Sequence, residues 1–325
     1  MEKLPFESVF AAEMDAYLNY NTAAGRLECS FYTHLRIFDK FCVDHGICRL
    51  AFTKDDAAKW VQRRAAEAST THYARVNGIK RFLTYLNKKG YDVFVTRDVK
   101  FRPTDFQPHI YTDDEVGRYF RVLDAYTTPW SRKDAVQYPV LFRLMYCCGT
   151  RINETLGIKK SDVDLETGVI RLHETKNNQE RLVVMGNDMK SLMTQFADKC
   201  FYLIPDDGYI FTNRNGGRLT GDKIHDVHGE FLRLAGIPFL GEGHGPRVHD
   251  WRHTMAVKSF KQMIDSGLDM YVALPILSTY LGHKNIYATE RYVRLTMSIY
   301  PHIEERFRSK IEEVFGGGGN QNEED

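Results

Sequence analysis

An irregular stretch at residues 97–111 divides this chain into two parts and so limits the folds open to it. The stretch contains Pro103 and Pro108, and its apolar residues follow neither a helical nor a strand period. It ends at Thr112, and Glu115 three residues later completes the capping-box pattern that begins a helix. We therefore predict two domains joined by a linker, and a disordered glycine-rich, acidic tail. The predicted boundaries are 1–96 for the first domain, 97–111 for the linker, 112–315 for the second domain and 316–325 for the tail.

The first domain has helical periodicity along most of its length. Apolar residues recur at helical spacing at about 6–20, 27–45, 54–68 and 72–89. Thr53 precedes the third of these segments as an N-cap, with two aspartates in the first turn after it. We therefore expect a bundle of four helices.

The fourth of these helices is strongly basic although the whole chain carries a formal net charge of only +1. Residues 71–90 contain five basic residues and no acidic one, and the cations fall largely off the apolar stripe. Such a face is either simply solvated or contacts the phosphate backbone of a nucleic acid. The candidate contact residues are Arg75, Lys80, Arg81 and Lys88.

The second domain combines helices with one β-hairpin. Residues 168–172 alternate in polarity, a polar turn follows, and residues 181–185 form the return strand. Lys176 lies at the tip of this hairpin, where a lysine is either solvated or reaches a ligand. The fold class is therefore mainly α with a small β-sheet, with a helical first domain and a mixed α+β second domain.

Three short motifs in the second domain combine cations, histidines and a tyrosine. Arg151 begins a helix after Gly149-Thr150, and Glu154 lies one turn later on the same face, as a surface ion pair or as part of an anion site. His249 and Arg252 are three residues apart, so a helix directs both toward one point. The spacing of His249 and His253 also suits zinc, but no second pair of ligands lies nearby, so no metal is expected. Finally, Leu281-Gly282-His283 precedes Tyr292 by nine residues counted from the histidine.

In its order and spacing, this set resembles the tyrosine recombinase, or phage-integrase, family, and the resemblance covers essentially the whole chain. It implies that the first domain is a SAM-like core-binding domain that contacts DNA and that the second domain is catalytic. It also implies a site-specific DNA recombinase of a bacterial mobile element, which acts through a Holliday junction in integration, excision or resolution. The expected partner is double-stranded DNA, with possible accessory recombination factors, and no cofactor is expected.

The resemblance also assigns roles to the catalytic residues. Tyr292 is the nucleophile that forms a 3′-phosphotyrosyl intermediate, while the guanidinium groups of Arg151 and Arg252 bind the scissile phosphate. The remaining roles are Lys176 as general acid toward the leaving 5′-oxygen, His249 as base or hydrogen-bond partner of the nucleophile, His283 as donor to a non-bridging oxygen, and Glu154 as the group that orients Arg151 or a neighbouring histidine.

An amphipathic helix is expected after Pro301, with Ile303, Phe307 and Ile311 on its apolar face. It packs either on its own domain or, as the resemblance implies, on a neighbouring protomer in a tetramer on DNA. No apolar run reaches the ~20 residues of a membrane span, and no signal segment begins the chain, so we expect a cytoplasmic protein that joins the nucleoid when bound to DNA.

Two other functions use a similar set of residues. One is a type IB topoisomerase-like or junction-resolving enzyme acting on one duplex, which the helical first domain and the C-terminal helix argue against. The other is a non-catalytic DNA-binding paralogue, which would have no use for Tyr292.

Overall fold

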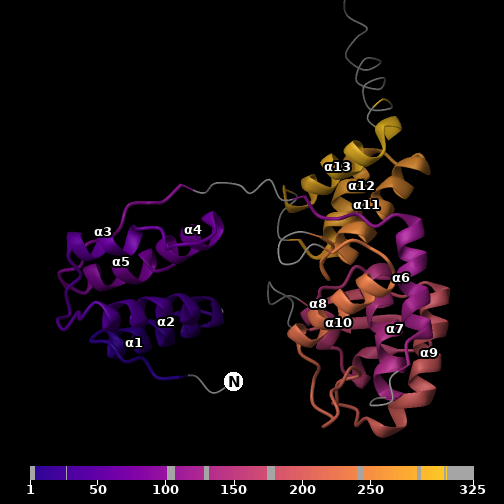
Figure 1. Cartoon of the computed structure of the whole chain (residues 1–325), viewed down its shortest axis with the longest axis horizontal. Helices are drawn as coiled ribbons and strands as arrows, with labels where there is room; N and C mark the ends of the chain where they lie inside the picture. The colour runs from indigo at the N-terminus through magenta and orange to yellow at the C-terminus, as the bar shows by residue number, and fades with distance from the viewer. Residues whose placement is uncertain are drawn as a thin grey trace, which may run out of the picture. The chain divides into compact units, whose positions relative to one another are not determined.

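The computed structural model describes residues 4–26, 28–100, 107–127, 132–173, 180–239, 245–283, 287–303 and 305. The chain forms two compact units, Met1–Phe106 and Gln107–Asp325, each with a hydrophobic core of its own (Figure 1). The fold is mostly helical with one small sheet, which confirms the predicted fold class. Across the described ranges, no helix is long and apolar enough to cross a membrane.

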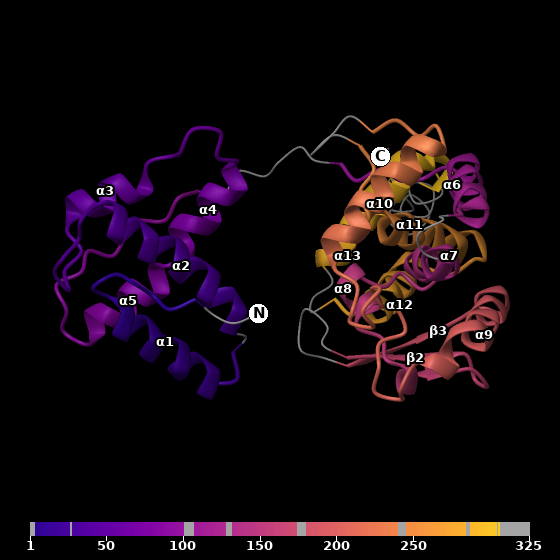
Figure 2. The same cartoon turned by 60° about the horizontal axis from the view of Figure 1, so that its bottom comes forward.

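The first unit is a bundle of helices (Figure 2). Its core is rich in aromatic side chains. Helix α1 packs against both α2 and α5, and α2 also packs against α4. In the centre, the ring of Phe38 meets those of Trp60 and Phe82 edge-on. The helices are α1 (Ala11–Ala23), α2 (Glu28–Asp44), α3 (Lys54–Val61), α4 (Ser69–Gly78) and α5 (Lys80–Lys88).

Local sequence signals locate the start of α3 correctly but not the course of the fourth predicted helix. The Oγ1 of Thr53 accepts from the Asp56 amide at 3.1 Å, and the Asp56 carboxylate accepts from the Thr53 amide at 3.0 Å, so this N-cap is confirmed. The predicted helix at 72–89 is instead divided into α4 and α5. At the junction Gly78 lies against the ring of His34 in α2, where a Cβ atom would come within 2.5 Å, and glycine is a weak helix former.

Arg75 is not part of an exposed basic face, which corrects the prediction for this residue. Its side chain is only 3% exposed, and its guanidinium donates to the Glu67 carboxylate at 2.7 and 2.9 Å. It also donates to the carbonyls of Trp60 and Gln62, and it lies over the Trp60 ring. In return, Arg75 lowers the pKa of Glu67 to about 2. Arg75 therefore holds the end of α3 and the segment after it against α4.

We expect Arg75→Gln to lower the free energy of unfolding of the first unit by about 3–5 kcal/mol, because it leaves the buried Glu67 carboxylate without its cation. Hydrogen exchange of the full chain, followed by mass spectrometry over peptides from residues 28–88, measures the change. The matched control is Arg81→Gln, at an exposed position of α5. It should change the free energy of unfolding by about 0.5 kcal/mol or less. Equal effects of the two substitutions would contradict the structural role.

The second unit combines a small three-stranded antiparallel sheet with eight helices among its described residues. Strands β1 (Val163–Asp164), β2 (Val169–Leu172) and β3 (Arg181–Val184) pair in that order, which confirms the predicted hairpin. Val169 pairs with Val184, and Leu172 pairs with Arg181. The helices are α6 (Asp113–Ala125), α7 (Arg132–Cys147), α8 (Ile152–Leu156), α9 (Asn187–Cys200), α10 (Gly221–Leu234), α11 (Asp250–Asp265), α12 (Met270–Leu281) and α13 (Tyr287–Ile299). Two 3₁₀ turns lie at Lys160–Asp162 and Phe201–Leu203.

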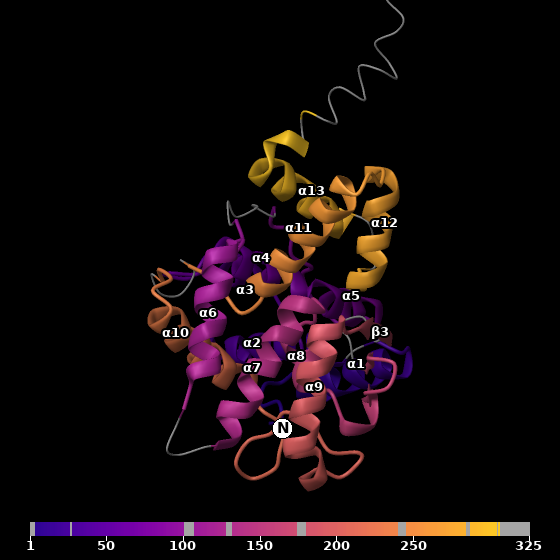
Figure 3. The same cartoon turned by 90° about the vertical axis from the view of Figure 1, so that its right-hand side faces the viewer.

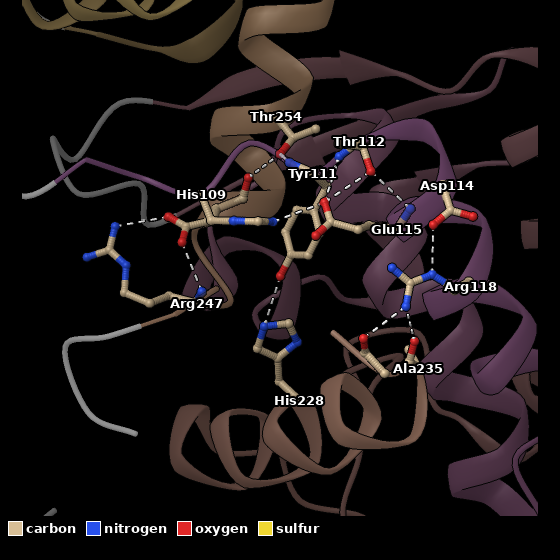
Figure 4. A network of polar contacts seen from close by, with 12 residues as sticks. His109, Tyr111, Thr112, Asp114, Glu115, Arg118, His228, Ala235, Arg247 and Thr254 are labelled. Atoms are coloured by element: carbon tan, nitrogen blue, oxygen red, sulfur yellow. Dashed lines mark hydrogen bonds and ion pairs between the residues drawn. The ribbon is translucent and has the colours of Figure 1, made fainter. Parts of the chain in front are cut away.

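Helix α11 connects the two hydrophobic clusters of this unit. It packs on α7, whose cluster includes the sheet, and on α12 and α13, which gather with it at one end of the unit (Figure 3). The segment before α6 is anchored on the same helix. The Tyr111 ring stacks on the Trp251 ring, with centroids 3.9 Å apart. The Tyr111 amide donates to the Thr254 hydroxyl at 3.0 Å (Figure 4). The capping box of Thr112 and Glu115 then begins α6, as predicted.

Ile303 is fully buried in the cluster formed by α11, α12 and α13 of its own chain. Of the two arrangements left open for the C-terminal helix, Ile303 therefore follows packing on its own domain, and its side chain is not available for self-association in this arrangement. Phe307 and Ile311 lie outside the described residues.

Candidate active site

The buried guanidinium of Arg252 brings three chain segments together. Its side chain, only 1% exposed, donates from Nη1 to the Gly149 carbonyl and from Nη2 to the Leu281 carbonyl, both at 2.5 Å. Both neighbouring turns need glycine: Gly149 and Gly282 have φ of 60° and 63°. A Cβ atom at Gly149 would lie 2.9 Å from the sulfur of Met255. The turn before α8, the start of α11 and the end of α12 are therefore held at one point.

Arg151 reaches this point as the N-cap residue of α8. Its Nη1 donates to Glu154 Oε1 at 2.6 Å, and its amide donates to Glu154 Oε2 at 2.9 Å, so the predicted pair is present. Glu154 is buried and also accepts from Nη2 of Arg181 at 2.7 Å. Burial alone would raise the pKa of Glu154, but the two arginines and the amide outweigh it and lower the pKa. A fixed carboxylate thus orients an Arg151 side chain that keeps 18% of its surface exposed.

Tyr292 is buried on α13 between two histidines. Its side chain is 3% exposed, and its ring lies nearly parallel to that of His283, with centroids 6.0 Å apart. The His253 ring packs on another side at 5.4 Å. Burial raises the pKa of Tyr292, against the opposing effect of Arg252 and Arg151. The phenol is therefore protonated at neutral pH, and any reaction as a nucleophile requires a group that accepts its proton.

The three histidines of the site are neutral at pH 7; His253 and His283 lie against the Tyr292 ring, and His249 lies against His253. His249 is the exposed N-cap residue of α11, and its ring lies edge-on to that of His253, with centroids 4.7 Å apart. Desolvation by the surrounding protein and the nearby Arg252 and Arg151 lower the pKa of His249 to about 4. The same causes lower the pKa of His283 to about 4, while burial and the adjacent His249 lower the pKa of His253 to about 3. A neutral imidazole can accept a proton, as a general base must.

The hydrogen bonds of His283 determine which of its ring nitrogens carries the proton. Nε2 faces Nη2 of Arg252 at 3.3 Å, and Nδ1 faces the hydroxyl of buried Thr289 at 2.7 Å. Because arginine can only donate, Nε2 is the acceptor in the free protein and Nδ1–H donates to Thr289. A hydroxyl can both donate and accept, so Thr289 also supports the opposite tautomer, in which Nε2–H faces a ligand.

The structure thus brings together the predicted residues Arg151, Glu154, His249, Arg252, His283 and Tyr292, whereas Lys176 lies outside the described residues. The sequence analysis missed Arg181 and Thr289 as parts of the site, and it considered His253 only as a zinc ligand. The position of His253 one turn after His249 was a usable signal, but nothing in the sequence pairs Arg181 with Glu154. Within the described ranges, no group of three or more His, Cys, Asp or Glu residues could hold a metal ion.

Two basic hollows mark the first unit. The α1–α5 groove, of about 520 Å³, combines the predicted Lys80, Arg81 and Lys88 with Arg26 and the rings of Tyr17, Tyr20 and Tyr85. Arg81 and Lys88 are exposed there, while Lys80 donates to Asp98 at 2.7 Å. The α2–α3 groove, of about 720 Å³, was not predicted, because its cations come from separate segments. They are Arg36, Lys40, Lys59, Arg63 and Arg64, and the buried Arg75 also lines this groove.

We expect His249, His253 and His283 of the free protein to remain neutral from pH 8 to pH 5, because desolvation and neighbouring cations disfavour their charged forms. An NMR titration of ¹³C-labelled imidazoles, assigned with His→Gln variants, measures this directly. His173, whose pKa is raised by Glu180 and Asp162, should titrate above 6.5 in the same spectra.

In the unfolded chain His249, His253 and His283 take up protons near their ordinary pKa of 6.5, so the free energy of unfolding should fall as the pH drops from 6.5 toward 4. A midpoint above 6 for any of the three would contradict the site as described.

Comparison with known proteins agrees with this geometry. The model of the phage integrase family matches residues 113–298. A Sinorhizobium fredii protein named integrase/recombinase y4rB is 28% identical over 74% of this chain and 79% of its own length. Tyrosine recombinase XerC of Lactobacillus delbrueckii subsp. bulgaricus is 25% identical over 71% of this chain and 74% of its own. The crystal structure of XerH bound to its difH substrate before cleavage matches 89% of this chain and 83% of that chain, with a TM-score of 0.61 and 17% identity, so it shares the fold. Because the family model spans more than half of its residues, the chain belongs to the phage integrase family of tyrosine recombinases.

Proposed function

We propose that this site-specific recombinase cleaves DNA by transferring a phosphodiester to the hydroxyl of Tyr292 and later rejoins it by the reverse step. The observation that carries the proposal is the junction of three segments at Arg252, which places a buried tyrosine beside two arginines and neutral histidines. The covalent step forms the bond between the tyrosine oxygen and phosphorus and breaks the bond from phosphorus to the 5′-oxygen. Since one phosphoester replaces another, rejoining needs no external energy source.

Arg151 and Arg252 bind the scissile phosphate in this mechanism. A pentacoordinate transition state carries extra negative charge on its non-bridging oxygens, and guanidinium groups match such oxygens in pairs. Burial lowers the pKa of Arg252 only to about 10, so it stays charged at neutral pH. Preorganised charge of this kind is commonly the largest catalytic contribution, worth several kcal/mol.

Proton transfer is shared among the remaining residues. His249, neutral and on the same junction, accepts the Tyr292 proton directly or through a water molecule. Lys176 donates a proton to the leaving 5′-oxygen. The Nε2–H tautomer of His283, supported by a donated hydrogen bond from Thr289 to Nδ1, donates to a non-bridging oxygen. No net proton is gained or lost in the cleavage step.

The first unit binds the DNA backbone through the α1–α5 groove. Arg81 and Lys88 are exposed cations there, and the tyrosines beside them offer flat surfaces for sugars. Phosphate contacts of this kind supply affinity without reading sequence. The α2–α3 groove provides a second set of cations, while Arg75, which lines this groove, is already paired with Glu67 and only 3% exposed.

Assembly and biological role extend the proposal. The enzyme acts as a tetramer on paired duplexes, through a Holliday junction, with Phe307 and Ile311 contributing to contacts between protomers and with accessory factors where a site requires them. We place it in the bacterial cytoplasm, on the nucleoid when bound, as the recombinase of a mobile element. In support, a solved structure of the same fold is a Tn1549 transposon integrase in complex with transposon right end DNA.

Tyr292→Phe should abolish covalent attachment to a nicked duplex drawn from the ends of the host element, while DNA affinity stays within a factor of about two. The substitution keeps the ring against His283 and removes only the nucleophilic oxygen. The measurement is an SDS-resistant adduct mapped by mass spectrometry, with Tyr300→Phe as the matched control. Arg151→Ala should slow adduct formation by roughly 10²–10³-fold. An adduct that persists in Tyr292→Phe would disprove the assignment, and tight binding without any adduct would favour a non-catalytic role.

Combined substitution of Arg81→Gln and Lys88→Gln should weaken DNA binding equally for all sequences. It should also reduce the slope of log K against log salt by about one to two, since each lost phosphate contact contributes ~0.9. Binding titrations between about 50 and 200 mM salt measure the slope. The control is Lys89→Gln, whose ammonium already pairs with Glu13 at 2.6 Å. An unchanged slope in the double variant, with a reduced slope in Arg63→Gln/Arg64→Gln, would move the contact to the α2–α3 groove.

A further inference from the structure

Arg181, the first residue of β3, is a third arginine beside the site and has no role in the mechanism above. Its side chain is 9% exposed. Nη2 donates to Glu154 Oε2 at 2.7 Å, and Nη1 donates to the Tyr280 carbonyl at 2.6 Å. One guanidinium therefore joins the hairpin strand, helix α8 and the last turn of α12.

Each acceptor of Arg181 adjoins a group that faces the phosphate. Glu154 holds Arg151 through two hydrogen bonds, so Arg181 fixes the carboxylate that fixes Arg151. Tyr280 lies in the last turn of α12, directly before the segment that leads to His283. Between them, Gly282 adopts a left-handed conformation, and a Cβ atom there would come within 2.9 Å of the Arg181 Cδ. The aliphatic part of the Arg181 side chain therefore packs against the turn that precedes His283.

The charge balance also suits a phosphate ligand. The site holds three guanidinium groups and one carboxylate: Arg151 and Arg181 contact Glu154, and Arg252 lies nearby. The pKa values of Arg252 and His283 are lowered in part by Arg181. The site thus carries excess positive charge before DNA arrives. In addition, Arg181 Nε is buried without a hydrogen-bond partner among the described residues. An unsatisfied buried donor lowers the stability of the fold, so a contribution to stability alone is a poor explanation for this arginine. A lysine would keep the charge but could not span both acceptors with a planar fork.

We propose that Arg181 is a positioning residue for phosphate binding, which sets Arg151 through Glu154 and His283 through the turn at Tyr280–Gly282. The inference rests on the proposed function. It predicts that Arg181 acts on the charge of the non-bridging oxygens and not on protonation of the leaving oxygen, although β3 belongs to the hairpin that carries Lys176.

The first measurement compares Arg181→Lys with the wild-type full chain in single-turnover adduct formation on the nicked duplex. We expect a loss of roughly 100-fold in rate, because displacements of about 1 Å can cost that much, with DNA affinity within a factor of about three. The matched control is Arg171→Lys, an exposed arginine on the neighbouring strand β2, which should cleave like the wild type. Thermal unfolding shows whether each variant folds. If Arg181→Lys does not fold, Glu154→Gln breaks the same link from its other side and is tested in its place.

Altered substrates then separate positioning at the phosphate from a structural role or from an effect on Lys176. A methylphosphonate at the scissile position removes the charge from a non-bridging oxygen, so the deficit of Arg181→Lys should shrink from about 100-fold to about 10-fold or less. A 5′-bridging phosphorothiolate has a leaving group that needs no general acid, so it should rescue Lys176→Ala and leave the Arg181→Lys deficit unchanged.

Three outcomes overturn the inference. They are wild-type rates in Arg181→Lys, an unchanged deficit on the methylphosphonate, and rescue of Arg181→Lys by the phosphorothiolate. Failure of the wild-type protein to form a Tyr292 adduct overturns the proposed function as well, whereas a wild-type adduct together with any of the three overturns the role of Arg181 alone.

Discussion

The site depends on one buried guanidinium. Arg252 comes from the helix that joins both clusters of the second unit, and it donates to carbonyls at the end of α7 and the end of α12. Burying a cation is costly unless acceptors replace its water, and here two backbone carbonyls do so. The guanidinium that we propose to bind phosphate is therefore also the group that fixes the backbone around it. A phosphate oxygen arriving at Arg252 must share donors with these carbonyls, so DNA binding and the local geometry of the turns are coupled.

The protonation states follow from the same arrangement. Desolvation lowers the pKa values of His249 and His283, and the positive charges of Arg252 and Arg151 lower both further. Both imidazoles are neutral when no DNA is bound. His249 can therefore accept a proton, and His283 can carry its proton on either ring nitrogen. A bound phosphate reverses the field, because its negative charge favours protonated imidazoles. In the proposed mechanism, substrate binding therefore makes His249 a stronger base when Tyr292 loses its proton.

Sequence reasoning succeeded where one segment contains the whole signal. The capping boxes at Thr53 and Thr112, the hairpin, and the spacing of His249 and Arg252 are local patterns with local physical causes. It failed where the partner of a side chain lies elsewhere in the fold. Ile303 looks like any residue on an amphipathic stripe, and only the packing of α11–α13 shows that its own chain covers it. The division of α4 from α5 likewise depends on His34, a residue of another helix.

The cations illustrate why such failures are not random. No sequence pattern distinguishes Arg75, Arg81 and Arg181. Their roles differ because the fold places different hydrogen-bond acceptors beside each of them. Arg75 has Glu67 and two carbonyls, Arg181 has Glu154 and one carbonyl, and Arg81 lies exposed in a hollow. A phosphate gains most from a guanidinium that protein acceptors hold in place without satisfying all of its donors. Arg151, fixed by Glu154 yet still partly exposed, meets that condition, whereas the buried Arg75 does not. The net charge of the chain therefore says little about DNA binding, and the acceptors of each cation decide which ones remain for the substrate.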